Sequence, residues 1–122
     1  MNKLIKLVMG VLAVGLIANF LFGGGVDKDA DIPQLIKDGA LVIDTRTARE
    51  FSEGHIDKAV NIPFDIVDQS IGRHATDKSK PIVVYCRSGA RSGSAKKSLE
   101  SMGYTRVVNG GGLHRMHKLL AE

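Results

Sequence analysis

The single cysteine of this 122-residue chain lies in a context that favours a reactive thiol. Cys86 follows the apolar run at residues 82–85, and Arg87 and Arg91 come within the next five residues. A cysteine reacts as its thiolate, and nearby cations or a helix N-terminus lower its pKa from about 8.5. Many free cysteines are instead small buried hydrophobes. The two arginines lead us to predict that Cys86 is a nucleophile beside an anion site.

The loop at residues 86–91 connects a predicted strand to a predicted helix. Its N–H groups, and those of the first helical turn, are expected to point inward, with the positive end of the helix dipole behind them. Gly89 allows a tight turn. Ser88 is interpreted either as a hydrogen-bond donor or as a small loop residue, and Ser92 as the helix N-cap rather than a ligand.

The predicted elements alternate between strand and helix along the chain. Short apolar runs predict strands, and capping signals with helical spacing predict helices. The strands are expected at residues 40–44, 59–62, 82–85 and 107–108, and the helices at residues 32–38, 47–53, 64–71 and 92–102 and after the glycines at 110–112. This alternation predicts right-handed crossovers and a parallel sheet. Asp44 and Cys86 then share the rim at the carboxyl ends of the strands, where ligands bind.

Three groups of residues resemble the signatures of the rhodanese family of thiosulfate sulfurtransferases. The first is Val-Ile-Asp-Thr-Arg at residues 42–46, followed by residues 50–51, 54–56 and 59–63. The second is Cys-Arg-Ser-Gly-Ala-Arg at residues 86–91, and the third is Gly-Tyr at 103–104 with Val-Val-Asn-Gly-Gly at 107–111. The resemblance implies an α/β rhodanese-like fold over residues 26–122, with a parallel sheet of about five strands and helices on both faces.

The resemblance also implies a mechanism. The Cys86 thiolate takes the outer sulfur of a donor such as thiosulfate, becomes a persulfide, and passes the sulfur to a thiophilic acceptor such as cyanide. Arg87 and Arg91 are expected to attract the dianionic donor. The substrate-binding residues implied are Arg87, Ser88, Gly89, Ala90 and Arg91. No cofactor or metal is implied, and a protein acceptor is compatible with the same site.

Four further residues are given structural interpretations. Asp44 is expected to order the end of its strand and Arg46 to pair with it, so that both support the site indirectly. Glu50 is interpreted as the capping-box partner of Thr47. His55 is expected to be a hydrogen-bonded structural histidine rather than a general base, because a thiolate of low pKa needs no base.

Two other functions use a similar loop. Phosphatases and arsenate reductases of related fold have a loop one residue longer, suited to a phosphate-sized oxyanion. The six residues at 86–91 make a smaller cradle that suits one sulfur. A non-catalytic persulfide carrier or binding module of the cell envelope needs the same loop, and turnover with a small acceptor would distinguish it from an enzyme.

Residues 1–25 differ in kind from the rest of the chain. Lys3 and Lys6 precede an uncharged stretch at residues 7–22, and glycines occupy 23–25. Its length lies between a signal-peptide core and a membrane-spanning helix, and an Ala-x-Ala cleavage site is missing. We expect a retained membrane anchor rather than a cleaved signal. Either one would place the domain in the cell envelope on the periplasmic side, anchored or secreted after cleavage.

The charge of the chain does not favour nucleic-acid binding. Without Lys3 and Lys6, 15 of the 17 basic residues remain against 13 acidic ones, a net charge of +2. These charges are mixed along the sequence and few aromatic residues accompany them. One cysteine cannot form an internal disulfide, so a lone thiol in an oxidising compartment also favours a functional Cys86.

Overall fold

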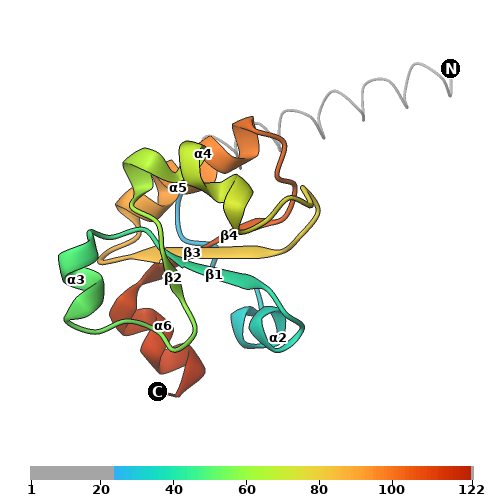
Figure 1. The fold of residues 1–122 in the computed structure, drawn as a ribbon. Coiled ribbons are helices and arrows are strands. Elements are labelled where there is room, and N and C mark those ends of the chain that lie inside the picture. Colours follow the sequence, from blue (N-terminus) through green and yellow to red (C-terminus); the bar gives the residue numbers. More distant parts are fainter. Residues whose placement is uncertain (1–23, 122) are drawn as a thin grey trace, which may run out of the picture.

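The computed structural model describes residues 24–121, which form a parallel α/β sheet with helices on both faces (Figure 1). The strands are β1 (Leu41–Asp44), β2 (Val60–Asn61), β3 (Ile82–Cys86) and β4 (Val107–Gly112). Their order is β2-β1-β3-β4, and all neighbouring strands run parallel. The predicted fold class is confirmed. Within the described residues the sheet has four strands, where about five were expected.

Helices α4 (Val67–Ser70) and α5 (Ala90–Ser101) lie on one side of the sheet, and α2 (Ile32–Lys37) and α6 (Leu113–Leu120) lie on the other (Figure 1). The side chains of β3 alternate between two apolar cores, because successive residues of a strand point to opposite faces. Ile82 and Val84 pack with Leu99 of α5. Val83 and Tyr85 pack on the α2 and α6 side. Cys86 therefore leaves the sheet on the side of α5.

Two predicted helix starts are confirmed at the level of their hydrogen bonds. Asp31 caps α2 by accepting a bond from the Gln34 amide at 3.2 Å. In α3 (Ala48–Ser52), Thr47 and Glu50 form the reciprocal capping box. These short helices bury few side chains, so the caps supply much of what fixes their first turns.

The structure departs from the predicted elements at two places. The helix expected at residues 64–71 is divided into η1 (Phe64–Ile66), α4 and η2 (Ile71–Arg73), and the side chain of Phe64 is exposed. Strand β4 continues through the glycines at 110–112, where a turn was expected. A Cβ at Gly112 would lie 2.3 Å from the Arg87 carbonyl oxygen, and Gly111 has a φ of 87° where the register between β3 and β4 shifts, so these glycines allow close packing and an irregular strand.

Within the described residues, no fifth strand forms at the edge of the sheet beside β4. The segment at residues 24–27, blue in Figure 1, runs beside α5 and β4. The Asp27 amide donates to the Asn109 carbonyl at 2.9 Å, but the Asn109 amide donates to the carboxylate of Asp27 at 2.8 Å. A side chain thus takes the place of a backbone acceptor, and no strand is formed here.

Most of the predicted signal or anchor at residues 1–25 lies outside the described residues. Among residues 24–121, no helix is long and apolar enough to span a lipid bilayer.

Candidate active site

Cys86 ends β3 and is buried, with only 1% of its surface exposed. The loop that follows turns sharply at Gly89, whose φ of 103° is in the left-handed region. A Cβ at this position would lie 2.9 Å from Cγ2 of Val26. Both the backbone conformation and the contact therefore require glycine. Gly89 is also the N-cap of α5, which begins at Ala90.

The Cys86 sulfur lies inside a cradle of hydrogen-bond donors. The Gly89 amide donates to Sγ at 2.9 Å, and the Ser92 hydroxyl lies 3.3 Å from it. Burial raises the pKa of the Cys86 thiol, but bonds from the Ser92 hydroxyl and from the amides of Ser92, Ser88 and Gly89 outweigh it. The net effect lowers the pKa, because these donors favour the thiolate.

The interpretation of Ser92 as the N-cap is wrong. Because Gly89 takes that position, α5 begins two residues earlier than predicted, and Ser92 lies within its first turn. There its buried side chain faces both the Cys86 sulfur and Asn109. The sequence signal that could have indicated this contact is the position of Ser92 directly after the loop, one helical turn from Gly89.

Arg91 lies in an ion pair rather than facing an open site. Its Nη1 and Nη2 donate to the two carboxylate oxygens of Glu50 at 2.7 and 3.0 Å. Both side chains are partly buried, with 29% and 28% of their surface exposed. The pair lowers the pKa of Glu50 to about 2, chiefly through the hydrogen bonds from Arg91. Glu50 therefore has a second role, beyond its capping box, that the sequence interpretation missed.

The other loop side chains are at the surface. Arg87, Ser88 and Ala90 are exposed, while Gly89 is buried. Arg87 is therefore the loop cation most open to solvent and to an approaching anion. Within the loop at residues 86–91, the amides of Ser88 and Gly89 are directed at the Cys86 sulfur, while the side chain of Arg87 is exposed.

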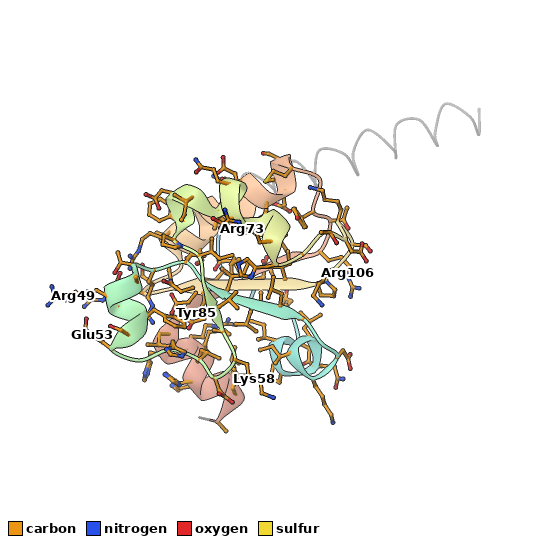
Figure 2. The ribbon with its side chains drawn as sticks, viewed as in Figure 1. Arg49, Glu53, Lys58, Arg73, Tyr85 and Arg106 are labelled. Atoms are coloured by element: carbon orange, nitrogen blue, oxygen red, sulfur yellow. The ribbon has the colours of Figure 1, made fainter. Side chains whose placement is uncertain are left out.

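Asp44 and Arg46 form a buried network below the loop. Arg46 donates Nε and Nη2 to the two carboxylate oxygens of Asp44, the shorter bond being 2.6 Å, and Nη2 also donates to the Gly54 carbonyl. The bonds to Asp44 outweigh burial and raise the pKa of the Arg46 guanidinium. The hydroxyl of Tyr85, labelled in Figure 2, donates to Asp44 at 2.8 Å. The structural pairing expected for Asp44 and Arg46 is what the structure contains.

His55 is exposed, and its Nδ1 lies 2.8 Å from the Phe51 carbonyl oxygen. Its ring stacks on that of Phe51 with centroids 3.6 Å apart. These contacts agree with the structural interpretation of His55.

The chain has clear relatives among known proteins. Residues 29–114 match a family model described as Rhodanese-like domain. Thiosulfate sulfurtransferase PspE of Escherichia coli (strain K12) is 42% identical over 71 residues, which cover 58% of this chain and 68% of that protein. A sulfurtransferase of Allochromatium vinosum is 39% identical over 69 residues, 57% of this chain and 63% of that protein, less than two thirds of its length.

A solved structure, a rhodanese with anions from E. coli, has the same fold. It superposes with a TM-score of 0.61 at 39% sequence identity, and the match covers 63% of this chain and 91% of that one.

Proposed function

Because this chain belongs to the rhodanese-like domain family, we propose that it moves a sulfane sulfur from an anionic donor to a thiophilic acceptor through a persulfide on Cys86. Relatives named as sulfurtransferases place the chain in that enzyme class. The observation that carries the finer proposal is the cradle around Sγ, where Gly89 and Ser92 lie at 2.9 and 3.3 Å. A sulfur held this way is ionised at lower pH than a free thiol.

In the first step the Cys86 thiolate attacks the outer sulfur of thiosulfate. A new S–S bond forms to Cys86, the S–S bond of the donor breaks, and its electron pair leaves with sulfite. The exposed Arg87 offsets the charge of the approaching dianion and of the departing sulfite. The inward amides of residues 88, 89 and 92 stabilise the anionic sulfur before and after transfer.

In the second step a nucleophile such as cyanide attacks the terminal sulfur of the persulfide. The S–S bond breaks, its electron pair returns to Cys86, and thiocyanate is released. Neither step requires a proton, which agrees with a cradle in which hydrogen-bond donors surround the sulfur and no general base contacts it among the described residues. The two-step route divides one difficult transfer into two easier ones.

Thiocyanate formation from thiosulfate and cyanide tests this proposal. The full-length protein should turn over, and the Cys86→Ser variant should be inactive while its unfolding midpoint stays near that of the wild type. Because Cys86 is the only cysteine, no second thiol can substitute for it. An active Cys86→Ser variant would contradict the assignment of the nucleophile.

We also propose, from the sequence alone, that residues 1–25 anchor the domain on the periplasmic side of a membrane. Carbonate extraction of membranes should leave the full-length chain in the pellet. A mature N-terminus near Val26, found by mass spectrometry, would instead indicate a cleaved signal.

A further inference from the structure

Asn109 is fully buried on β4, behind the Cys86 loop. Its Nδ2 donates to the carbonyl oxygens of Gly24 and Gly89 at 2.9 and 3.0 Å. Its Oδ1 accepts from the Ser92 hydroxyl at 2.7 Å and from the Gly111 amide at 3.0 Å. Turning the amide over would place its oxygen against two carbonyls, so these four bonds fix its orientation.

The backbone of Asn109 is fixed as well. Its amide donates to Oδ2 of Asp27, and its carbonyl accepts from the Asp27 amide. The same Asp27 oxygen pairs with Nζ of Lys96 at 2.8 Å, and Lys96 has only 1% of its surface exposed. Asn109 is therefore a rigid group that joins the N-terminal segment, α5 and the loop.

The Ser92 hydroxyl lies between Asn109 and the nucleophile and has one proton to donate. While Cys86 is a thiol, Ser92 can donate to Oδ1 of Asn109 and accept the S–H. Once Cys86 is ionised, the Ser92 proton can turn to the sulfur, and Oδ1 keeps its bond from Gly111. We propose that Asn109 is a positioning residue. It holds the Ser92 side chain, and it holds Gly89 through the Gly89 carbonyl, so that the Ser92 hydroxyl and the Gly89 amide can both donate to the Cys86 sulfur.

Most charged groups around the Cys86 thiol are paired with an opposite charge, so hydrogen bonds from neutral donors can set how readily the thiol ionises. On α5 and α3, Arg91 is paired with Glu50, and Arg91 interacts electrostatically with Cys86. On β1, Asp44 and Arg46 pair with each other, and behind Asn109 so do Asp27 and Lys96. Arg87 is exposed to solvent, which screens its charge. The neutral donors are thus the groups in direct contact with the sulfur.

Asn109→Asp in the full-length protein tests the inference. The carboxylate would hold the Ser92 proton more strongly than the amide oxygen does and would add a negative charge near the thiolate. The substitution also removes the Nδ2 donor to the Gly89 carbonyl. All three effects disfavour ionisation of the Cys86 thiol. The rate of iodoacetamide alkylation, followed against pH, reports the pKa of the single cysteine. We expect this pKa to rise by about one unit or more, with a roughly tenfold lower rate at neutral pH and an unchanged plateau at high pH.

Asn61→Asp is the matched control. Nδ2 of Asn61 also donates to two backbone carbonyls, those of Asp44 and Arg46, but among the hydrogen bonds of the described residues none joins Asn61 to Ser92. It should lower the free energy of unfolding and leave the alkylation midpoint in place. A midpoint for Asn109→Asp within about 0.3 unit of the wild type, or an equal shift in Asn61→Asp, would overturn the inference.

If Asn109→Asp does not fold, NMR spectra of the wild type and of Ser92→Ala test the role of Asn109 instead. The side-chain amide signals of Asn109 should titrate with Cys86 in wild-type NMR spectra and lose most of that response in Ser92→Ala. An undiminished response in Ser92→Ala would contradict the role of Asn109. The inference rests on Cys86 as the proposed nucleophile, but alkylation needs no sulfur transfer, so its outcome is independent of thiocyanate formation.

Discussion

Replacing Arg91 with alanine should impair the use of thiosulfate more than it impairs folding. The change removes one cation from the loop and also leaves the carboxylate of Glu50 without its partner at the rim of the site. The anionic donor then approaches an unpaired negative charge in place of a neutral pair. Two losses therefore add in the same variant.

The loss of stability and the repulsion of the donor can each be given an expected magnitude. The two bonds of the pair are short, 2.7 and 3.0 Å, but more than a quarter of each side chain is exposed. The pair is therefore intermediate between a buried charged hydrogen bond and a surface ion pair. Its loss should lower the free energy of unfolding by about 1–2 kcal/mol. For a dianion taken to bind about 6 Å from the Glu50 carboxylate in a water-like dielectric, Coulomb's law gives a repulsion of about 1.4 kcal/mol, a tenfold effect on binding.

Thiocyanate formation at varied thiosulfate concentrations measures the effect. In Arg91→Ala, kcat/KM for thiosulfate should fall at least about tenfold. The double variant Arg91→Ala/Glu50→Gln should recover much of that loss, because glutamine removes the charge and still supports a capping box. Arg49→Ala is the matched control, since Arg49 and Glu53 extend from α3 into solvent as an exposed pair 3.8 Å apart (Figure 2).

Two results would show that Arg91 and Glu50 do not affect the donor in this way. One is a kcat/KM for Arg91→Ala within about twofold of the wild type, a difference of about 0.4 kcal/mol. The other is a double variant no more active than Arg91→Ala, which would show that the freed carboxylate does not repel the donor.

Three further predictions concern stability. Tyr85→Phe removes a hydroxyl that bonds buried Asp44 and a buried amide, so urea unfolding should show a loss of about 2–4 kcal/mol; an unchanged midpoint would show that the network is dispensable. A helix-interior Gly→Ala change usually stabilises by up to about 1 kcal/mol. In Gly93→Ala the new Cβ would lie 2.1 Å from a backbone oxygen of the N-terminal segment, so the thermal midpoint should fall. Gly72→Ala is the control, because a Cβ at Gly72 has open space around it and meets no such clash. A higher thermal midpoint for Gly93→Ala would show that the N-terminal segment moves aside at little cost in stability. The pKa of Glu50 is lowered to about 2 in the folded protein. The stabilisation that ionised Glu50 gives the fold is therefore complete above its unfolded pKa of about 4.3, and it is lost as pH falls toward 2. Urea unfolding of wild type and Glu50→Gln at several pH values should therefore converge in acid, and a constant difference would exclude this linkage.

Local signals in the sequence predicted most of the fold. The caps at Asp31 and Thr47, and the apolar runs that became β1 and β3, depend on residues near one another in the chain. The pairing of Asp44 with Arg46 was also predictable, since only one residue separates them in the chain. These interactions need no knowledge of tertiary structure.

The missed features depend on distant contacts or on backbone geometry. Glu50 and Arg91 are 41 positions apart, and only the packing of α3 beside the loop brings them together. Ser92 became part of α5 because Gly89 adopts a left-handed φ of 103°, which sequence alone did not specify. Asn109 lay within a recognised motif, but its contacts with Ser92 and the N-terminal segment come from three separate elements.

The intact mass of the full-length protein after treatment with thiosulfate shows whether Cys86 takes up sulfur. We expect one added sulfur, located on Cys86 by peptide mapping. Cyanide should remove it, and it should be absent in Cys86→Ser. Wild-type protein that gains no sulfur, or sulfur that persists in Cys86→Ser, would contradict a persulfide mechanism at this cysteine.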